Sequence, residues 1–192
     1  EDVMRHLVFE PLQMRASYTL KGFLAKSRVA HVYRVLPPTR QPLFDADKRR
    51  EDADDMQAPN PEHRYLPAAG NLFTDAASLG RLLCMLLRGG APLLSRESVE
   101  RMQSPLAPYG KKAPAMHHGL GMVFLENPRL SPAPLWGHQG LAYGAVEGVF
   151  YRQDTGDGLV FLNNGASEAR QGHLACVNRD LIRWALGTGK GV

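Results

Sequence analysis

The feature that most constrains this chain is a hairpin signal in its second half, "AVEGVFYRQDTGDGLVFLNNG" at residues 145–165. Two apolar runs, Gly148–Tyr151 and Leu159–Asn163, flank the turn-forming sequence QDTGDG, and this arrangement predicts two antiparallel strands. The segments "HHGLGMVFLE" (residues 117–126) and "LWGHQG" precede the hairpin, and each predicts one more strand, the first with glycines that permit bending. We therefore expect an antiparallel meander of three or four strands.

Helical periodicity dominates the first half of the chain. Apolar Val3, Met4, Leu7 and Val8 predict a helix over residues 2–10 that ends at Pro11. The segment "TDAASLGRLLCMLLRGG" predicts a second helix, capped by Thr74 or Asp75 and ended by Gly89-Gly90. Its buried stripe is expected to contain Leu79, Leu82, Leu83 and Leu86.

Two further helices are predicted beside the strands. "LLSRESVERMQSP" indicates a short helix capped by Ser95, and "SEARQGHLACVNRDLIRWALG" indicates a closing amphipathic helix. The expected apolar side of the closing helix is Leu174, Val177, Leu181, Ile182, Trp184 and Ala185. The predicted order is helices first, then a meander of strands, then a closing helix. This order is typical of an α+β fold in which helices flank an antiparallel sheet.

The segment between these helices is less regular. Apolar and polar side chains alternate over residues 30–36, which predicts a short strand that ends at Pro37-Pro38. Residues 37–67 contain six prolines and most of the charge clusters, so we expect a long irregular loop. Loops of this length often form functional walls, and residues 37–67 are a candidate for one.

Composition excludes several classes of protein. The net charge is +4, and the densest charged run, "DKRREDADD", mixes both signs, which does not favour a nucleic-acid site. No apolar run approaches the roughly 18 residues that a membrane span needs. The opening "EDVMRHLVFEPL" does not resemble a signal peptide, and the sequence does not indicate in which cellular compartment the protein acts. Cys84 and Cys176 lie in apolar helical patterns and are expected to be buried thiols.

Common motifs for cofactors and metals are not matched. In "GTGKGV", Lys190 is followed by Gly191 where a phosphate loop needs Ser or Thr. His117 and His118 are adjacent, so on a strand they point to opposite faces and do not favour one shared metal. We expect neither a metal nor a cofactor.

Six short segments, taken in order, resemble the serine hydrolases of the penicillin-binding protein and class C β-lactamase type, with their related esterases and D-amino-acid peptidases. The segments are "VFEPLQMRASYT", "PAAGNLFTDAASLGRLL", "LLSRESVERM", "HHGLGMVF", "GHQGLAYG" and "YRQDTGDGLVFLNNG". The fifth resembles the family's K-T-G or H-x-G triplet. The resemblance implies a bacterial hydrolase that cleaves amides or esters through an acyl-enzyme, in the periplasm or the cytoplasm.

The resemblance implies roles for four consecutive residues. His138, Gln139 and Gly140 would line the substrate cleft, and the amide of Leu141 would supply half of an oxyanion hole. Gly144 would give the bend that follows. Without the resemblance, these residues indicate only a strand with a buried histidine and bends that glycine permits.

The triplet departs from the family pattern in two positions. Gln139 stands where Ser or Thr is usual, and its amide has a different reach. His138 stands where β-lactamases have lysine, and a histidine is mostly neutral at pH 7. A fixed positive charge for a β-lactam carboxylate is therefore missing, which favours an esterase or a peptidase.

The family's nucleophile and base are not found in these 192 residues. No serine is followed by lysine three residues later, and no tyrosine or serine is followed by asparagine two residues later. In the family both elements lie upstream of the segment similar to "VFEPLQMRASYT". The resemblance therefore implies that residues 1–192 correspond to the C-terminal part of one domain. Residues 1–116 would form its helical region and residues 117–192 its strands and closing helix.

Two classes of function stay open. The first is a part of a serine hydrolase that is inactive alone and is completed by a second chain carrying the N-terminal half, acting on a small-molecule or peptide acyl substrate. The second is a non-catalytic domain that binds peptides or associates with itself. A third reading, a hydrolase that uses His138 with another serine, finds no G-x-S-x-G elbow in the sequence.

Overall fold

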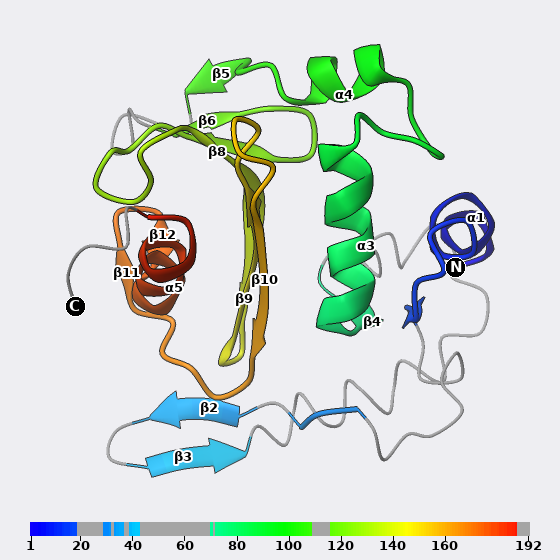
Figure 1. Ribbon diagram of the computed structural model, residues 1–192. Coiled ribbons are helices and arrows are strands. Elements are labelled where there is room, and N and C mark those ends of the chain that lie inside the picture. The colour runs from blue at the N-terminus through cyan, green and yellow to red at the C-terminus, as the bar shows by residue number, and fades with distance from the viewer. Residues whose placement is uncertain are drawn as a thin grey trace.

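The computed structural model describes residues 1–18, 29–31, 33–36, 39–42, 70, 72–108 and 116–187. Its centre is a six-stranded antiparallel sheet in which the strands follow one another in chain order (Figure 1). The strands are β5 (Ala107–Pro108), β6 (Met116–His118), β7 (Val123–Leu125), β8 (Leu135–Ala142), β9 (Ala145–Tyr151) and β10 (Gly158–Asn163). The α+β layout with an antiparallel meander is confirmed, with more strands than the three or four expected.

The predicted hairpin is β9 and β10. Its register runs from Tyr151 opposite Gly158 to Val146 opposite Asn163, so the turn is the predicted QDTGDG region. Arg152 holds this turn with two contacts to Asp154, Nε to Oδ1 at 3.0 Å and Nη2 to Oδ2 at 2.7 Å. A guanidinium that binds both carboxylate oxygens fixes the geometry of a turn better than a single contact.

The single strand expected over residues 117–126 is wrong. The segment forms two strands, β6 and β7, that pair with His118 opposite Val123. Gly119 N–H donates to the Met122 carbonyl at 2.8 Å, and Gly121 adopts a φ of +70°. Glycine tolerates this left-handed conformation, so the glycines make a reversal here and not a bend.

Two of the three helices predicted before the sheet begin with side-chain caps. In α3 (Ala76–Leu87), Asp75 and not Thr74 is the cap, and its carboxylate accepts from Ser78 N–H at 2.7 Å. This hydrogen bond holds the pKa of Asp75 below its usual value. In α4 (Arg96–Met102), Ser95 Oγ accepts from Ser98 N–H at 3.1 Å, as predicted.

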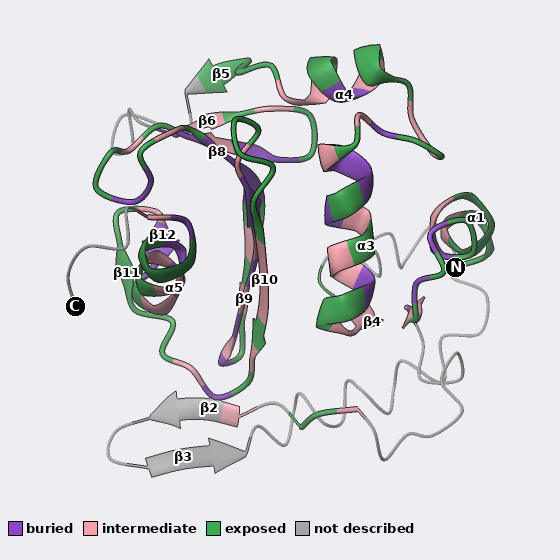
Figure 2. Ribbon diagram, in the orientation of Figure 1, coloured by how far each residue is buried: buried purple, intermediate pink, exposed green. Residues whose placement is uncertain are grey.

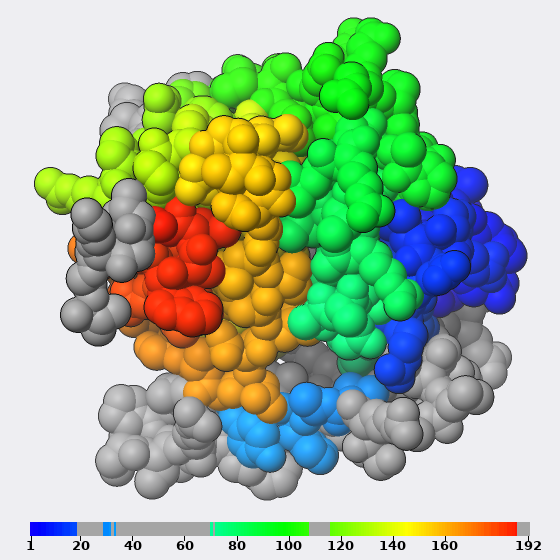
Figure 3. Space-filling view, in the orientation of Figure 1, coloured from blue at the N-terminus to red at the C-terminus, as the bar shows by residue number. Residues whose placement is uncertain are grey.

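The sheet lies between two helices, with α3 against one face and the closing helix α5 (Cys176–Leu186) against the other (Figure 1). Buried residues gather along β9 and its neighbours, between the two helices (Figure 2). The space-filling view shows α3 in contact with the β9–β10 hairpin (Figure 3). Each face has its own apolar core, with Leu83, Trp136 and Tyr151 on the α3 side and Leu135, Phe150 and Ile182 on the α5 side.

Several residues expected inside helices are exposed. In α5, Asn178, Ile182 and Leu186 recur every four residues and face the sheet, which leaves Trp184 73% exposed on the other side. Cys84 and Cys176 are both exposed, so the expected burial of the two thiols is wrong. In α3 the buried stripe is Leu83 and Leu86 with Met85, whereas Leu79 and Leu82 are half-buried.

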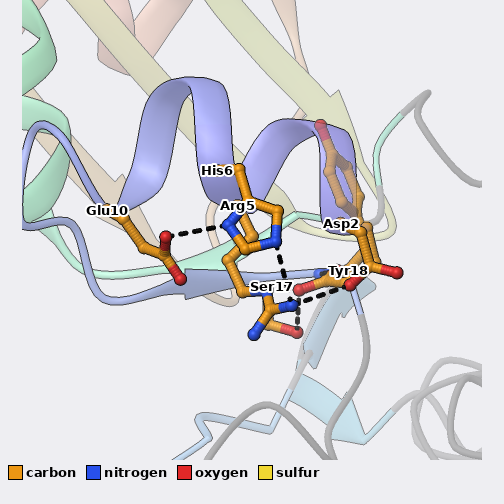
Figure 4. Close-up of polar contacts among 7 residues, drawn as sticks. Asp2, Arg5, His6, Glu10, Ser17 and Tyr18 are labelled. Carbon is orange, nitrogen blue, oxygen red and sulfur yellow. Dashed lines mark hydrogen bonds and ion pairs between the residues drawn. The ribbon is translucent and has the colours of Figure 1, made fainter.

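The N-terminal helix forms where predicted, as α1 (Asp2–Met4) continued by the π-helical η1 (Arg5–Phe9). Phe9 is buried, but Val3 and Leu7 are exposed, contrary to expectation. Glu1 ties the helix to the chain after it: its carboxylate accepts from Ser17 Oγ at 3.1 Å and from Tyr18 N–H at 2.7 Å. The surrounding contacts are drawn in Figure 4.

Three two-stranded pairs complete the described structure. The strand β1 (Ala16–Ser17) pairs with β4 (Phe73–Thr74), and β11 (Arg170–Gln171) pairs with β12 (Leu174–Ala175). The strand expected over residues 30–36 is β2 (Tyr33–Leu36), and it pairs with β3 (Thr39–Pro42). The irregular loop expected over residues 37–67 therefore contains a strand at Thr39–Pro42, and residues 37–38 and 43–67 lie outside the described residues. None of the described helices is long and apolar enough to cross a membrane.

Candidate active site on strand β8

The candidate site residues His138, Gln139, Gly140 and Leu141 occupy the second half of β8. A two-residue turn, Tyr143-Gly144, joins β8 to β9 with φ values of +56° and +83°. Positive φ at both positions is the type I′ geometry, which matches the twist of a tight hairpin. Gly144, expected to give the bend after the triplet, is part of this turn.

A short segment after β10 anchors this turn from both directions. Gly144 N–H donates to the Glu168 carboxylate at 2.6 Å, and the Gly144 carbonyl accepts from Ala166 N–H at 3.0 Å. Both backbone groups of the turn glycine are therefore satisfied. The end of β8 is consequently held in place by contacts outside the sheet.

One edge of β8 is open beside the candidate residues. Strand β9 pairs with β8 from Trp136 to Ala142, whereas β7 pairs only with Leu135–Gly137. Among the described residues, no strand pairs with the β7 side of β8 from His138 to Ala142. This stretch of β8 presents a row of backbone groups on its free side.

The ladder determines which amides point to the open edge. Ala142 and Ala145 flank the two-residue turn and form a hydrogen-bonded pair, and hydrogen-bonded and non-hydrogen-bonded pairs alternate along an antiparallel ladder. Leu141 and Gln139 are therefore in non-hydrogen-bonded positions relative to β9. Their N–H and C=O groups point away from β9, toward the open edge.

His138 lies at the same edge. Its ring is exposed, and Nδ1 lies 2.7 Å from the Gln139 carbonyl oxygen. Because a carbonyl only accepts, Nδ1 carries the hydrogen in this contact, and Nε2 is the acceptor of the neutral ring. Among the described residues, no three His, Cys, Asp or Glu side chains are grouped so that they could hold a metal ion.

The Gln139 side chain points to the opposite face, toward α5. Its Oε1 accepts from Ala175 N–H at 3.1 Å and from Asn178 Nδ2 at 2.9 Å, and its Nε2 donates to the His173 carbonyl. A glutamine amide offers two acceptor and two donor positions, and three of these four are used. Gln139 therefore connects β8 to the start of α5, a structural contact that the sequence did not predict.

Gly140 stands opposite Glu147 of β9. A Cβ atom on Gly140 would lie 3.1 Å from Glu147 Oε2, so the carboxylate folds over the glycine backbone. Burial raises the pKa of Glu147 above its ordinary value. Sequence reasoning missed Glu147, although a lone charged residue in the apolar run "AVEGVF" was a signal.

Two of the three buried serines among the described residues hold parts of the fold together. Ser78 Oγ accepts from Arg15 N–H at 2.8 Å, and Ser17 Oγ donates to Glu1. The third, Ser131, has no hydrogen-bond partner for its Oγ among the described residues, so no described group is placed to remove its proton.

Comparison with known proteins gives a family match over most of the chain. A model of the Beta-lactamase family matches residues 1–181. No curated protein sequence matches the chain.

Solved structures of three hydrolase-like proteins share the fold. An octameric penicillin-binding protein homologue from Pyrococcus abyssi has a TM-score of 0.66 at 18% identity, covering 98% of this chain and 40% of that one. A D-stereospecific amidohydrolase from Streptomyces sp. has a TM-score of 0.64 at 17% identity, and the match covers 99% of this chain and 48% of that one. EstCE1, a hydrolase with promiscuous acyltransferase activity, has a TM-score of 0.72 at 18% identity, and the match covers 97% of this chain and 50% of that one. The chain thus spans at most half the length of each of these structures.

Proposed function

This chain belongs to the Beta-lactamase family, and from that premise we propose that its β8 edge is the acyl-binding wall of a serine hydrolase that cleaves amides or esters. Residues 1–192 correspond in this proposal to the C-terminal part of one β-lactamase-like domain. Residues 1–116 are its helical region and residues 117–192 its strands and closing helix. The serine nucleophile and its base come from outside these residues, so the chain alone forms no acyl-enzyme.

One observation carries the proposal: the Leu141 N–H points to an unpaired stretch of β8 that also presents His138. An amide that points to a strand edge unpaired among the described residues, beside a glycine, can bind the oxygen that becomes negatively charged as an acyl group is attacked. Removing one such donor typically costs about 3 kcal/mol of transition-state stabilisation. In its neutral form, with Nδ1–H on the Gln139 carbonyl, the His138 ring has Nε2 available to accept a proton or a hydroxyl hydrogen.

The residues at the edge favour an ester or a peptide-like amide over a β-lactam. His138 occupies the position where the resemblance places a lysine in β-lactamases, and it supplies no permanent positive charge for a carboxylate. The Gln139 side chain turns toward α5, which takes its side-chain amide away from the open edge. The site therefore holds an acyl group mainly through the backbone groups of Gln139 and Leu141, which point away from β9.

A second candidate function, a non-catalytic domain that associates with itself or with a partner chain, is favoured by the outer edge of β10. This strand ends the described sheet, and Leu162 on it is 37% exposed. The outer edge of this six-residue strand has no pairing strand among the described residues, and such an edge is a template for pairing with another strand. The same edge is where a chain carrying the rest of the domain can complete the sheet.

Native mass spectrometry after incubation with a fluorophosphonate probe tests the two functions together. The proposed function expects this chain to stay unlabelled alone and a labelled second chain to appear in the complex once the rest of the domain is supplied. His138→Ala should then lower the rate of labelling, whereas Gln153→Ala, an exposed change in the β9–β10 turn, should not.

Three results of this experiment have different meanings. An unlabelled oligomer of this chain, with no labelling in any complex, supports the non-catalytic domain. An adduct on this chain itself would show that one of its own serines is a nucleophile and would overturn the proposal as stated. Labelling of the complex that is insensitive to His138→Ala would remove His138 from the site.

A further inference from the structure

Glu147 is the most unusual side chain beside the β8 edge. It stands on β9 between Gly140 of β8 and Leu162 of β10, its two partners across the ladders. Neither neighbour carries a polar side chain, and the Glu147 side chain is half-buried between them. The carboxylate therefore lies on an apolar strip of the sheet, partly shielded from water.

The Glu147 carboxylate has no partner among the described residues. Apart from its pairing with β8 and β10, Glu147 has one hydrogen bond to a described residue, in which its backbone carbonyl accepts from Asn178 Nδ2 at 3.2 Å on the other face of the sheet. Burial is the only cause of the raised pKa of Glu147, so no cation and no hydrogen-bond donor offsets the cost of removing it from water. Polar groups that a fold removes from water normally have a hydrogen-bond partner.

The position of the carboxylate places it in the path of a ligand. Its Oε2 lies over Gly140, in the space that a side chain at position 140 would take. His138 is the diagonal neighbour of Glu147 on the same face, at a spacing that long side chains can bridge. A molecule held against the backbone of Gly140 and Leu141 would therefore meet the Glu147 carboxylate.

We propose that Glu147 binds a protonated amine of the substrate, so that the substrate class is an amide or ester whose acyl portion carries a positively charged primary amine. This inference rests on the proposed function of the β8 edge. An ammonium group supplies what the carboxylate lacks, namely a positive charge and up to three hydrogen-bond donors in a compact head. In a partly dry site such a charge-assisted contact is stronger than in water.

Other ligand charges fit the position less well. A substrate carboxylate would meet a like charge across a short distance. A neutral alkyl group would cover the half-buried Glu147 carboxylate further without supplying a donor, so it gains nothing from this residue. Glu147 therefore distinguishes an ammonium group from a methyl group of similar size.

Nuclear magnetic resonance titration of the full chain with glycinamide and propionamide tests this inference. The two amides have almost the same shape, and at pH 7 they differ by an ammonium in place of a methyl group. Both should perturb the backbone amides of residues 138–141, and glycinamide should bind at least about tenfold more tightly, which corresponds to about 1.4 kcal/mol. Saturating glycinamide should also lower the titration midpoint of the Glu147 carboxyl resonance, because a bound cation favours the carboxylate.

Glu147→Gln should remove the preference by weakening glycinamide about tenfold while leaving propionamide unchanged. Glu100→Gln, which removes an exposed carboxylate from α4, should change neither compound. Equal binding of the two amides, or glycinamide binding unaffected by Glu147→Gln, overturns the inference and leaves the proposed function standing. If neither amide perturbs residues 138–141, the acyl-binding role of the β8 edge fails as well.

Discussion

Gln139 and Glu147 are polar residues on neighbouring strands, and they lie on opposite faces of the same sheet. Gln139 faces α5 and uses three of its four hydrogen-bonding positions, on His173, Ala175 and Asn178. Glu147 faces the other way and its carboxylate has no partner among the described residues. Polar groups that serve a fold are satisfied within it, whereas a polar group left unsatisfied beside an open edge is available for a ligand.

The α5 face is therefore expected to be the more sensitive of the two to mutation. Asn178 is fully buried, and its Nδ2 donates both to Gln139 Oε1 and to the Glu147 carbonyl. Asn178→Ala should lower the free energy of unfolding by roughly 2–3 kcal/mol, because it removes two hydrogen bonds and leaves buried acceptors without donors. Urea denaturation of the variant and the parent chain measures the difference.

Gln153→Ala provides the control for this comparison, because residue 153 is exposed in the β9–β10 turn. It should change stability by no more than about 0.5 kcal/mol. An Asn178→Ala protein as stable as this control would show that water replaces the lost contacts. The α5 face would then be no more rigid than the β8 edge.

A smaller effect is expected where the end of β8 is anchored. Glu168→Ala removes the acceptor of Gly144 N–H, and we expect a loss of about 1 kcal/mol. Amide hydrogen exchange should show faster exchange at Gly144 and at the adjoining end of β8. Exchange that is unchanged at these amides would mean that the Tyr143-Gly144 turn holds its geometry without Glu168.

Local patterns predicted the elements, but not all the contacts between them. The Asp75 and Ser95 caps, the β9–β10 hairpin and the closing helix depend on neighbours within a few residues, and the sequence displays these directly. The reversal at Gly119–Met122 was missed because a glycine in a strand indicates either a bend or a turn.

The candidate site was predicted only in part, for a different reason. His138 to Leu141 are consecutive, so their grouping needed no knowledge of the fold. The partners of Gln139 are more than thirty residues away, and which way its side chain points depends on the register of the sheet. The approach of Glu147 to Gly140 likewise exists only through the β8–β9 register, so a sequence pattern could mark Glu147 as unusual but not place it.

The smallest change in stability is expected from Glu147→Gln. This substitution is also the most direct test of the difference between the satisfied Gln139 and the unpartnered Glu147. Burial raises the pKa of Glu147 in the folded chain above the ordinary value of 4.5, so the folded state binds this proton more tightly than the unfolded state. The parent chain should therefore lose stability as the pH rises from about the ordinary value through the raised pKa, and then level off. Glu147→Gln should lack this loss and be the more stable protein at pH 7.

The groups around Glu147 allow this pH dependence of stability to be assigned to Glu147 itself. Its ladder partners Gly140 and Leu162 do not titrate, and His138 is its titratable diagonal neighbour, present in both proteins. The difference between the two stability curves therefore isolates Glu147, while Glu100→Gln should follow the parent curve. Parallel curves for Glu147→Gln and the parent would mean that the carboxylate is solvated in the fold. Glycinamide extends the test, because a cation bound at Glu147 should stabilise the parent at pH 7 by mass action and leave Glu147→Gln almost unchanged.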